Sequence, residues 1–130
     1  MNVPILRVAR ASDDPDGLLR FYCDGLGLTV LCRFDDHAGF DGIMLGREGA
    51  PYHFEFTKKR GRVEGRAPGA DDLLVFYYPD CAEWHAAIRR MQIAGFMPVR
   101  SANPYWDWEG VTFEDSDGYR VVLQNASWDR

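Results

Sequence analysis

The chain has 130 residues, of which 46% are hydrophobic and 18 are aromatic, and its formal net charge is −5. This size and composition predict one compact domain with a substantial core, and the acidic balance argues against a nucleic-acid partner. No apolar run approaches the ~20 residues that a membrane-spanning helix needs, and the first residues lack a signal-peptide pattern, so we expect a cytoplasmic protein with no membrane partner.

The first half of the chain predicts one strand, one helix and three further strands. Residues 3–9 have strand character. Asp14 then offers an N-cap and Pro15 a first helical position, and apolar side chains continue with helical spacing to about residue 26. Further strands are predicted at 28–34, 43–45 and 52–57, and the segment 35–42, which is rich in Asp and Gly, is predicted to be a loop.

The second half predicts the same order of elements after a Gly-rich linker. A strand is expected at 73–78. Asp80 and Glu83 then have the spacing of a capping box, which predicts a helix over about 80–94. Short strands are expected near 97–100, 110–114 and 119–124. We therefore divide the single domain into module one (1–58), a linker (59–71) and module two (72–130).

The two halves also resemble each other in sequence, at an offset of 67 positions. The run 52–56 matches 119–123, and the apolar run 5–8 matches 72–75. Such a repeat indicates two copies of one supersecondary unit, with the natural functional site between them. The match is imperfect at one informative position, because Glu55 in the first copy corresponds to Val122 in the second.

Taken in order, several segments resemble the vicinal oxygen chelate superfamily, which includes glyoxalases, bleomycin-resistance proteins and extradiol dioxygenases. The resemblance is carried by Leu6-Arg7-Val8-Ala9, Phe21-Tyr22, Leu26-Gly27-Leu28, His53-Phe54-Glu55-Phe56 and Phe113-Glu114-Asp115-Ser116-Asp117-Gly118-Tyr119. In the last segment Ser116 replaces the proline of the family turn. The resemblance implies an α+β fold of two tandem βαβββ modules. These would form a curved mixed sheet around a central cavity, with the helices on the convex side.

Alternation along the strands assigns residues to the two faces of this sheet. The side chains expected on the helix side are Phe54, Phe56, Val121 and Leu123. Those expected to face the cavity are Arg7, His53, Glu55, Thr57, Arg120, Val122 and Gln124. Many members of the superfamily form homodimers that complete the cavity, and we expect a homodimer here.

The resemblance implies a divalent-metal centre that this chain does not preserve. Metal-using members place one ligand on each of four strands. Here the first-strand positions fall near Val3 and Leu73, where no histidine is found, and Val122 cannot bind a metal, so only Glu55 remains. His53 and His37 could supply further ligands to an ion at Glu55. Our expectation is nevertheless a protein without a metal cofactor.

Glu55 has two possible roles. It could form a buried structural pair with His53, Arg7 or Arg120, since an ionised carboxylate in an apolar cavity needs a partner. It could instead bind a cationic or hydroxylated ligand or act as a general base, with His53 beside it as a second candidate catalytic residue.

The most unusual local segment is Asn103-Pro104-Tyr105-Trp106-Asp107-Trp108-Glu109-Gly110. Its aromatic side chains could stack on a planar or cationic ligand at the mouth of the cavity. They could equally pack against a dimer partner or cover the core. The candidate ligand-binding residues are Arg7, His37, Tyr105, Trp106, Asp107, Trp108, Arg120 and Gln124.

These features predict a metal-free protein, similar to bleomycin-resistance members, that binds a small aromatic or cationic molecule. The alternative is a lyase, isomerase or dioxygenase of the glyoxalase type, with a divergent metal site or with Glu55 as general base.

Overall fold

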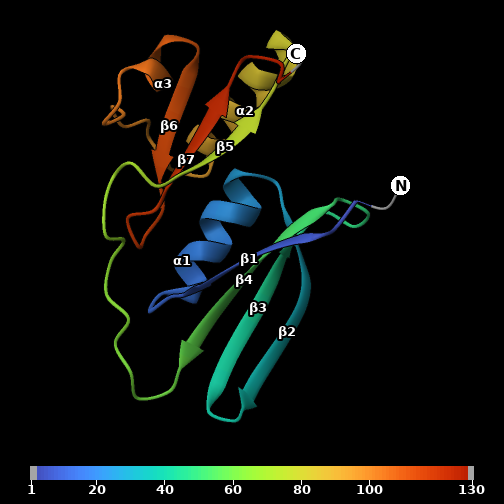
Figure 1. Cartoon of the computed structure of the whole chain (residues 1–130), viewed down its shortest axis with the longest axis vertical. Helices are drawn as coiled ribbons and strands as arrows, with labels where there is room; N and C mark the ends of the chain where they lie inside the picture. The colour runs from blue at the N-terminus through green and yellow to red at the C-terminus, as the bar shows by residue number, and fades with distance from the viewer. Residues whose placement is uncertain (1–2, 129–130) are drawn as a thin grey trace.

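A computed structural model describes residues 3–128 (Figure 1). Module one contains β1 (Leu6–Ala11), α1 (Pro15–Leu19), the π-helix η1 (Arg20–Gly25), β2 (Thr29–His37), β3 (Phe40–Gly46) and β4 (Tyr52–Lys59). Its sheet has the order β1-β4-β3-β2, with β1 parallel to β4 and the other pairs antiparallel.

Module two contains β5 (Leu73–Tyr77), α2 (Cys81–Ile93), the short α3 (Tyr105–Trp108), β6 (Gly110–Glu114) and β7 (Arg120–Gln124). Its sheet has the order β5-β7-β6, and Val99 adds a single antiparallel bridge to Thr112. The predicted α+β fold of two βαβββ-type modules is confirmed. The strand predicted near 97–100 is wrong, because only that one bridge forms.

The predicted loop at 35–42 is also wrong, because β2 and β3 pair as far as His37 and Phe40. Ala38 and Gly39, at the tip, have φ of 54° and 87°, the positive values that a two-residue hairpin turn requires. The Asp and Gly residues that suggested a loop therefore belong to the end of a long β-hairpin.

Local capping explains where both main helices start. Asp14 accepts a hydrogen bond from the Gly17 amide at 3.0 Å, and Pro15 occupies the first turn. Asp80 accepts from the Glu83 amide at 3.3 Å and starts α2. The first helix ends in a wider π-turn, where the Leu26 amide donates to the Phe21 carbonyl.

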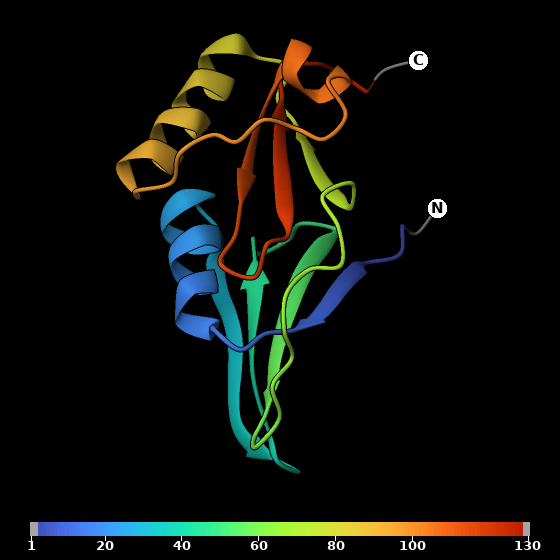
Figure 2. The ribbon, with the colours of Figure 1, turned by 90° about the vertical axis from the view of Figure 1, so that its left-hand side faces the viewer.

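The core lies between the sheets and the helices. Phe54, Phe56, Val121 and Leu123 are all buried there, as predicted from strand alternation. Figure 2 shows α1 and α2 along one side of the molecule and both sheets beside them. The modules meet largely through η1 and α2, where Arg90 of α2 donates to the carbonyls of Gly25 and Leu26 at 2.9 and 3.0 Å.

The two sheets do not close around a common cavity within one chain. They are separate sheets of four and three strands. The described part of the chain also has no helix long and apolar enough to cross a membrane.

Candidate functional site

The open face of the first sheet carries a cluster of Arg7, His53 and Glu55. The register of β1 and β4 places Arg7 opposite His53. The Arg7 Nε donates to His53 Nε2 at 2.8 Å, and its Nη1 lies 3.8 Å from Glu55 Oε2. The structure therefore brings together three of the residues that the sequence singled out.

This cluster is only partly covered. The side chains of Arg7 and Glu55 are 47% and 18% exposed. Within residues 3–128, Arg7 is the one charged partner of Glu55. The carboxylate therefore keeps acceptor capacity for a cation or a hydroxyl. His53 uses the lone pair of Nε2 to accept from Arg7, which leaves that nitrogen unavailable to a metal.

The inherited metal positions are not assembled. Val3 is 72% exposed and Val122 is fully buried, and neither carries a donor atom. Among residues 3–128, no group of three or more His, Cys, Asp or Glu side chains could hold a metal ion. His37 lies near the hairpin tip, five residues along β2 from Cys32, the strand neighbour of Met44 opposite Glu55. That spacing corresponds to about 16 Å, so His37 is not brought to Glu55.

In module two the face that corresponds to the open face of module one is covered. Val122 and Gln124, expected to line the cavity, are 0% and 4% exposed. The segment around α3 folds over them, and Gly110 makes this possible: a Cβ there would lie 2.3 Å from Gln124 Oε1 and 2.4 Å from the Trp106 carbonyl oxygen. The sequence repeat did not predict this cover, because α3 has no counterpart in module one.

Arg120 also lies within module two and does not reach Glu55. Its Nη1 donates to the Arg100 carbonyl at 3.0 Å, and its Nη2 lies 3.4 Å from Glu114 Oε2. These contacts tie the chain before α3 to β6 and β7.

The aromatic segment forms the outer wall of a hollow in module two. The rings of Tyr105 and Trp106 lie 5.0 Å apart, and those of Tyr105 and Trp108 lie 5.6 Å apart. Tyr105 and Trp108 are nevertheless 50% and 76% exposed. Asp107 is exposed, and its carboxylate accepts from the Ser101 amide at 3.3 Å. Asp107, a predicted ligand-binding residue, therefore also fixes the position of the segment.

The hollow has a volume of about 290 Å³ and is lined by Tyr105, Trp108, Glu109 and Gln124. Gln124 forms its buried wall, and within the described residues Gln124 Oε1 has no hydrogen-bond partner. A buried amide oxygen without a donor is costly and normally receives one. Exposed indole and phenol rings beside one carboxylate suit a flat ligand that carries positive charge.

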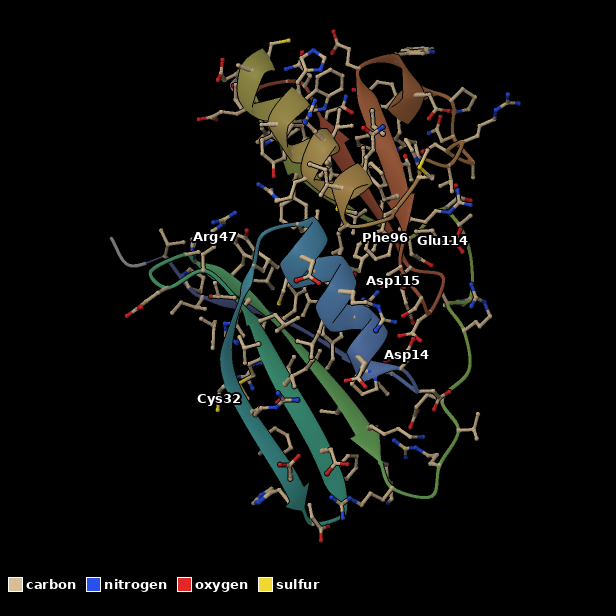
Figure 3. The ribbon with its side chains drawn as sticks, turned by 180° about the vertical axis from the view of Figure 1, so that it is seen from behind. Asp14, Cys32, Arg47, Phe96, Glu114 and Asp115 are labelled. Carbon is tan, nitrogen blue, oxygen red and sulfur yellow. The ribbon has the colours of Figure 1, made fainter. Side chains whose placement is uncertain are left out.

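Sequence reasoning missed two parts of this arrangement. Glu109 was seen only as part of an acidic, aromatic segment, although it lines the hollow. It also missed a buried polar link between the modules, in which Arg10 donates to Tyr22 Oη at 2.9 Å and to Asp115 Oδ2 at 3.1 Å. Figure 3 shows Asp115 beside α1, where the β6–β7 loop meets module one.

The Tyr22 hydroxyl donates to the same Asp115 oxygen at 2.9 Å. Burial, followed by the charge of Asp115, raises the pKa of the Tyr22 phenol well above its ordinary value. The phenol therefore stays protonated as a fixed donor. This link positions the modules and offers no reactive group.

Comparisons with known proteins identify relatives of the chain. Residues 6–57 match the YycE-like N-terminal domain and residues 71–125 match the YycE-like C-terminal domain. The chain is 42% identical over 121 residues to the uncharacterized protein YycE of Bacillus subtilis. The matched region covers 93% of this chain and 87% of that protein. The crystal structure of a YycE protein of unknown function from the same organism matches with a TM-score of 0.88 and 41% identity, over 96% of this chain and 91% of that one.

More distant structures share the fold. Glyoxalase I of Leishmania major matches with a TM-score of 0.71 and 20% identity, covering 96% of this chain and 88% of the enzyme. An antibiotic binding protein from Streptomyces sp. CB03234 matches with a TM-score of 0.65 and 18% identity, covering 98% of each chain.

Proposed function

This chain belongs to the YycE-like family and has the vicinal oxygen chelate fold, and we propose that it binds a small aromatic or cationic molecule without a metal ion. The observation that carries the proposal is the hollow beneath α3. It combines the exposed rings of Tyr105 and Trp108 with the carboxylate of Glu109, over a wall formed by the Gln124 side chain.

The proposed division of labour follows from the chemistry of these groups. Trp108 and Tyr105 would stack on a planar ligand, and a cationic ring would gain further from the negative faces of both rings. Glu109 would balance a positive charge, and the Gln124 side chain would form the wall against which the ligand rests. The fold is shared with an antibiotic binding protein, which is in keeping with a sequestering role.

The metal-free part of the proposal rests on residue identity. Val3, Leu73 and Val122 carry no ligand atom, so a second copy of the chain would bring no better donors to these positions. Three of the four positions that hold a metal in glyoxalase-type members are therefore unable to do so.

Calorimetry with proflavine, a flat tricyclic cation, tests the binding proposal. We expect Trp108→Ala to weaken proflavine binding by about tenfold or more, since stacking and cation–π contacts are worth roughly 1–2 kcal/mol each. Trp128→Ala is the matched control, because Trp128 is also exposed (67%) but lies against Tyr77. An anion of similar shape, 9-anthracenecarboxylate, should bind less well than proflavine. Equal loss in both variants would contradict the proposal.

A second candidate function, catalysis of the glyoxalase type with Glu55 as base or metal ligand, is favoured by the part-exposed Glu55 carboxylate with its one 3.8 Å ion pair. Metal titration separates the two. We expect chelator-treated and zinc- or nickel-supplemented protein to bind proflavine equally. Stoichiometric binding of a divalent ion that Glu55→Gln abolishes would overturn the metal-free proposal in favour of the enzyme.

We also propose that a second copy of the chain completes the cavity. Support comes from the open face of module one, where Arg7, His53 and Glu55 are only partly covered, and from the two sheets that stay unclosed within one chain. Light scattering coupled to size exclusion should give the mass of a dimer, and a monomeric mass at working concentration would reject this part of the proposal.

A further inference from the structure

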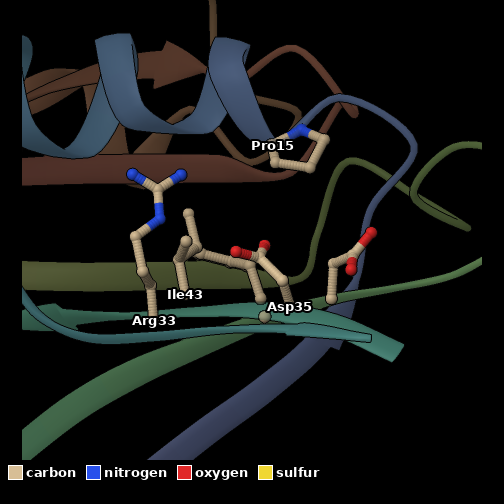
Figure 4. Close-up of a pocket in the computed structure, with 7 residues that line it drawn as sticks. Pro15, Arg33, Asp35 and Ile43 are labelled. Carbon is tan, nitrogen blue, oxygen red and sulfur yellow. The ribbon is translucent and has the colours of Figure 1, made fainter. Parts of the chain in front are cut away.

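A second hollow lies between the β2–β3 hairpin and the first turn of α1, on the helix side of the first sheet (Figure 4). It has a volume of about 140 Å³ and is lined by Pro15, Arg33, Asp35, Asp41, Gly42, Ile43 and Phe56. The hollow exists because the nine-residue β2 is longer than the helix above it, so the distal part of the hairpin has no helical cover.

The rim of this hollow carries opposite charges that are not paired with each other. Arg33 and Asp35 are two residues apart on β2, so both side chains rise on the same face, and Figure 4 shows Arg33 pointing toward α1. Neither side chain has a hydrogen bond or an ion pair with any part of the chain that the structure describes. Asp35 interacts with Arg60 through its charge alone, so its carboxylate can still accept hydrogen bonds, and it shares one hollow with the Arg33 guanidinium.

Asp41, the third charged group, is already engaged. Its Oδ1 accepts from Arg60 Nη2 at 2.8 Å and from the Asp36 amide at 2.8 Å. The hydrogen bond from Arg60 is the main reason that the pKa of Asp41 is lowered. Asp41 thus stays ionised, and its charge is balanced by Arg60.

We propose that this hollow binds a small zwitterion of the free α-amino acid class. The ligand carboxylate would pair with the Arg33 guanidinium, which can donate two parallel hydrogen bonds, and the ligand ammonium would pair with Asp35. A simple anion would meet the charge of Asp35, and a simple cation would meet Arg33. A ligand that carries both charges close together satisfies both ends.

The volume of the hollow and its apolar floor restrict which amino acids can bind. A volume of about 140 Å³ corresponds to roughly five waters at ~30 Å³ each, which suits an amino acid with a small side chain. The floor is apolar, since Ile43 and Phe56 are 4% and 2% exposed. A methyl group could rest on it, whereas a long or charged side chain would extend past the rim. Alanine is the smallest α-amino acid that carries such a methyl group.

This site is separate from the hollow beneath α3, which belongs to module two and presents aromatic rings. The two proposals therefore fail independently. Loss of proflavine binding on Trp108→Ala says nothing about Arg33, and loss of alanine binding on Arg33→Gln says nothing about Trp108.

Amide NMR titration of the full chain with L-alanine tests the proposal. We expect saturable chemical-shift changes at the amides of β2, of β3 and of the residues next to Pro15. The Kd should be on the order of 1 mM for a ligand of about six non-hydrogen atoms. Arg33→Gln and Asp35→Asn should each weaken binding by about tenfold, because each removes a charge-assisted contact. Arg89→Gln, on the exposed surface of α2, is the matched control and should bind alanine as the parent does.

Two analogues make the test specific. Propionate lacks the ammonium and ethylamine lacks the carboxylate, so each should bind at least about tenfold more weakly than alanine. The proposal is overturned if alanine produces no saturable shift at these amides, or if either analogue binds as well as alanine. It is also overturned if both variants, shown by their spectra to be folded, bind alanine like the parent.

Discussion

Asp117 shows how a single residue can make stability depend on pH. It is only 6% exposed, and its pKa is raised chiefly by burial, with the charges of Asp115 and Asp14 acting in the same direction. A hydrogen bond with Ser12 and the charge of Arg10 oppose that rise. The carboxyl therefore holds its proton more tightly in the folded chain than in the unfolded chain.

The sign of the effect on stability follows from this difference. Because the folded-state pKa lies above the ordinary value of 3.8, the folded state binds more protons, and the contribution of Asp117 is most favourable in acid. That contribution is lost as the pH rises from about 3.8 through the raised pKa. At neutral pH an ionised Asp117 is a net cost.

We predict that Asp117→Asn stabilises the folded chain at neutral pH by a few tenths to about 1 kcal/mol. The amide is neutral at every pH and can still accept from Ser12. Urea unfolding in mild acid and at neutral pH measures the effect, which should shrink toward acid. Asp72→Asn, at an exposed position, should leave the free energy of unfolding unchanged at both pH values. A variant less stable than the parent at neutral pH would contradict the assignment.

At the scale of elements, alternation along strands predicted the core faces correctly. The sequence offset of 67 between the two modules, in contrast, does not hold for every strand. Strand periodicity placed Phe54 and Phe56 correctly in the core. The offset of 67 holds from β4 to β7, since Phe54 and Val121 are equivalent core positions. The first strands differ by one residue, because Val8 pairs with Phe54 whereas Leu74 pairs with Val121. A shift of one residue exchanges the two faces of a strand, and pairing with the neighbouring strand decides it.

Gly110 allows α3 to lie close to the second sheet at the candidate site. It begins β6 directly beneath α3, where the chain passes close to Gln124 and the Trp106 carbonyl. A side chain at this position would lift the aromatic segment off the sheet. The hollow beneath α3 therefore depends on the absence of one Cβ.

We predict that Gly110→Ala destabilises the fold by about 1–3 kcal/mol and weakens proflavine binding, because forced overpacking moves α3. Thermal unfolding and calorimetry measure the two effects. Gly69→Ala is the matched control, since a Cβ there meets no atom within 4 Å and its φ is not positive. If Gly110→Ala bound proflavine with unchanged affinity, the proposed position of the hollow would be wrong.

At the scale of the whole molecule, the modules are joined by packing and by polar links. Phe21 of η1 lies 5.0 Å from the ring of Phe96, which follows α2. Met91 is fully buried, and its Sδ would lie 2.6 Å from a Cβ at Gly25, so α2 and η1 are in close contact. The buried link from Arg10 to Asp115 adds a second connection. Together these contacts predict that the two modules unfold as one cooperative unit.

We predict that Met91→Ala lowers the free energy of unfolding by about 2–5 kcal/mol, the range for removing a fully buried large side chain. Because the core is shared, amide hydrogen exchange should accelerate in β4 of module one as well as in β7 of module two. Met97→Ala, at a 69% exposed position, serves as the control. Faster exchange confined to β7 would show that the modules unfold independently.

The sequence by itself determined the α+β class, the βαβββ order of module one, the helix starts at Asp14 and Asp80 and the core faces of β4 and β7. These depend on local capping and on strand alternation, which are properties of neighbouring residues. It also determined that Val3, Leu73 and Val122 cannot bind a metal, because residue identity alone excludes them.

Only the tertiary structure decided which candidate residues meet. Arg7, His53 and Glu55 come together because β1 pairs with β4 in one particular register. Gln124 is shielded from solvent because α3 folds onto the second sheet. Arg33 and Asp35 share a hollow because the hairpin extends past α1. Each of these depends on how distant segments pack, and the pattern of neighbouring residues does not encode it.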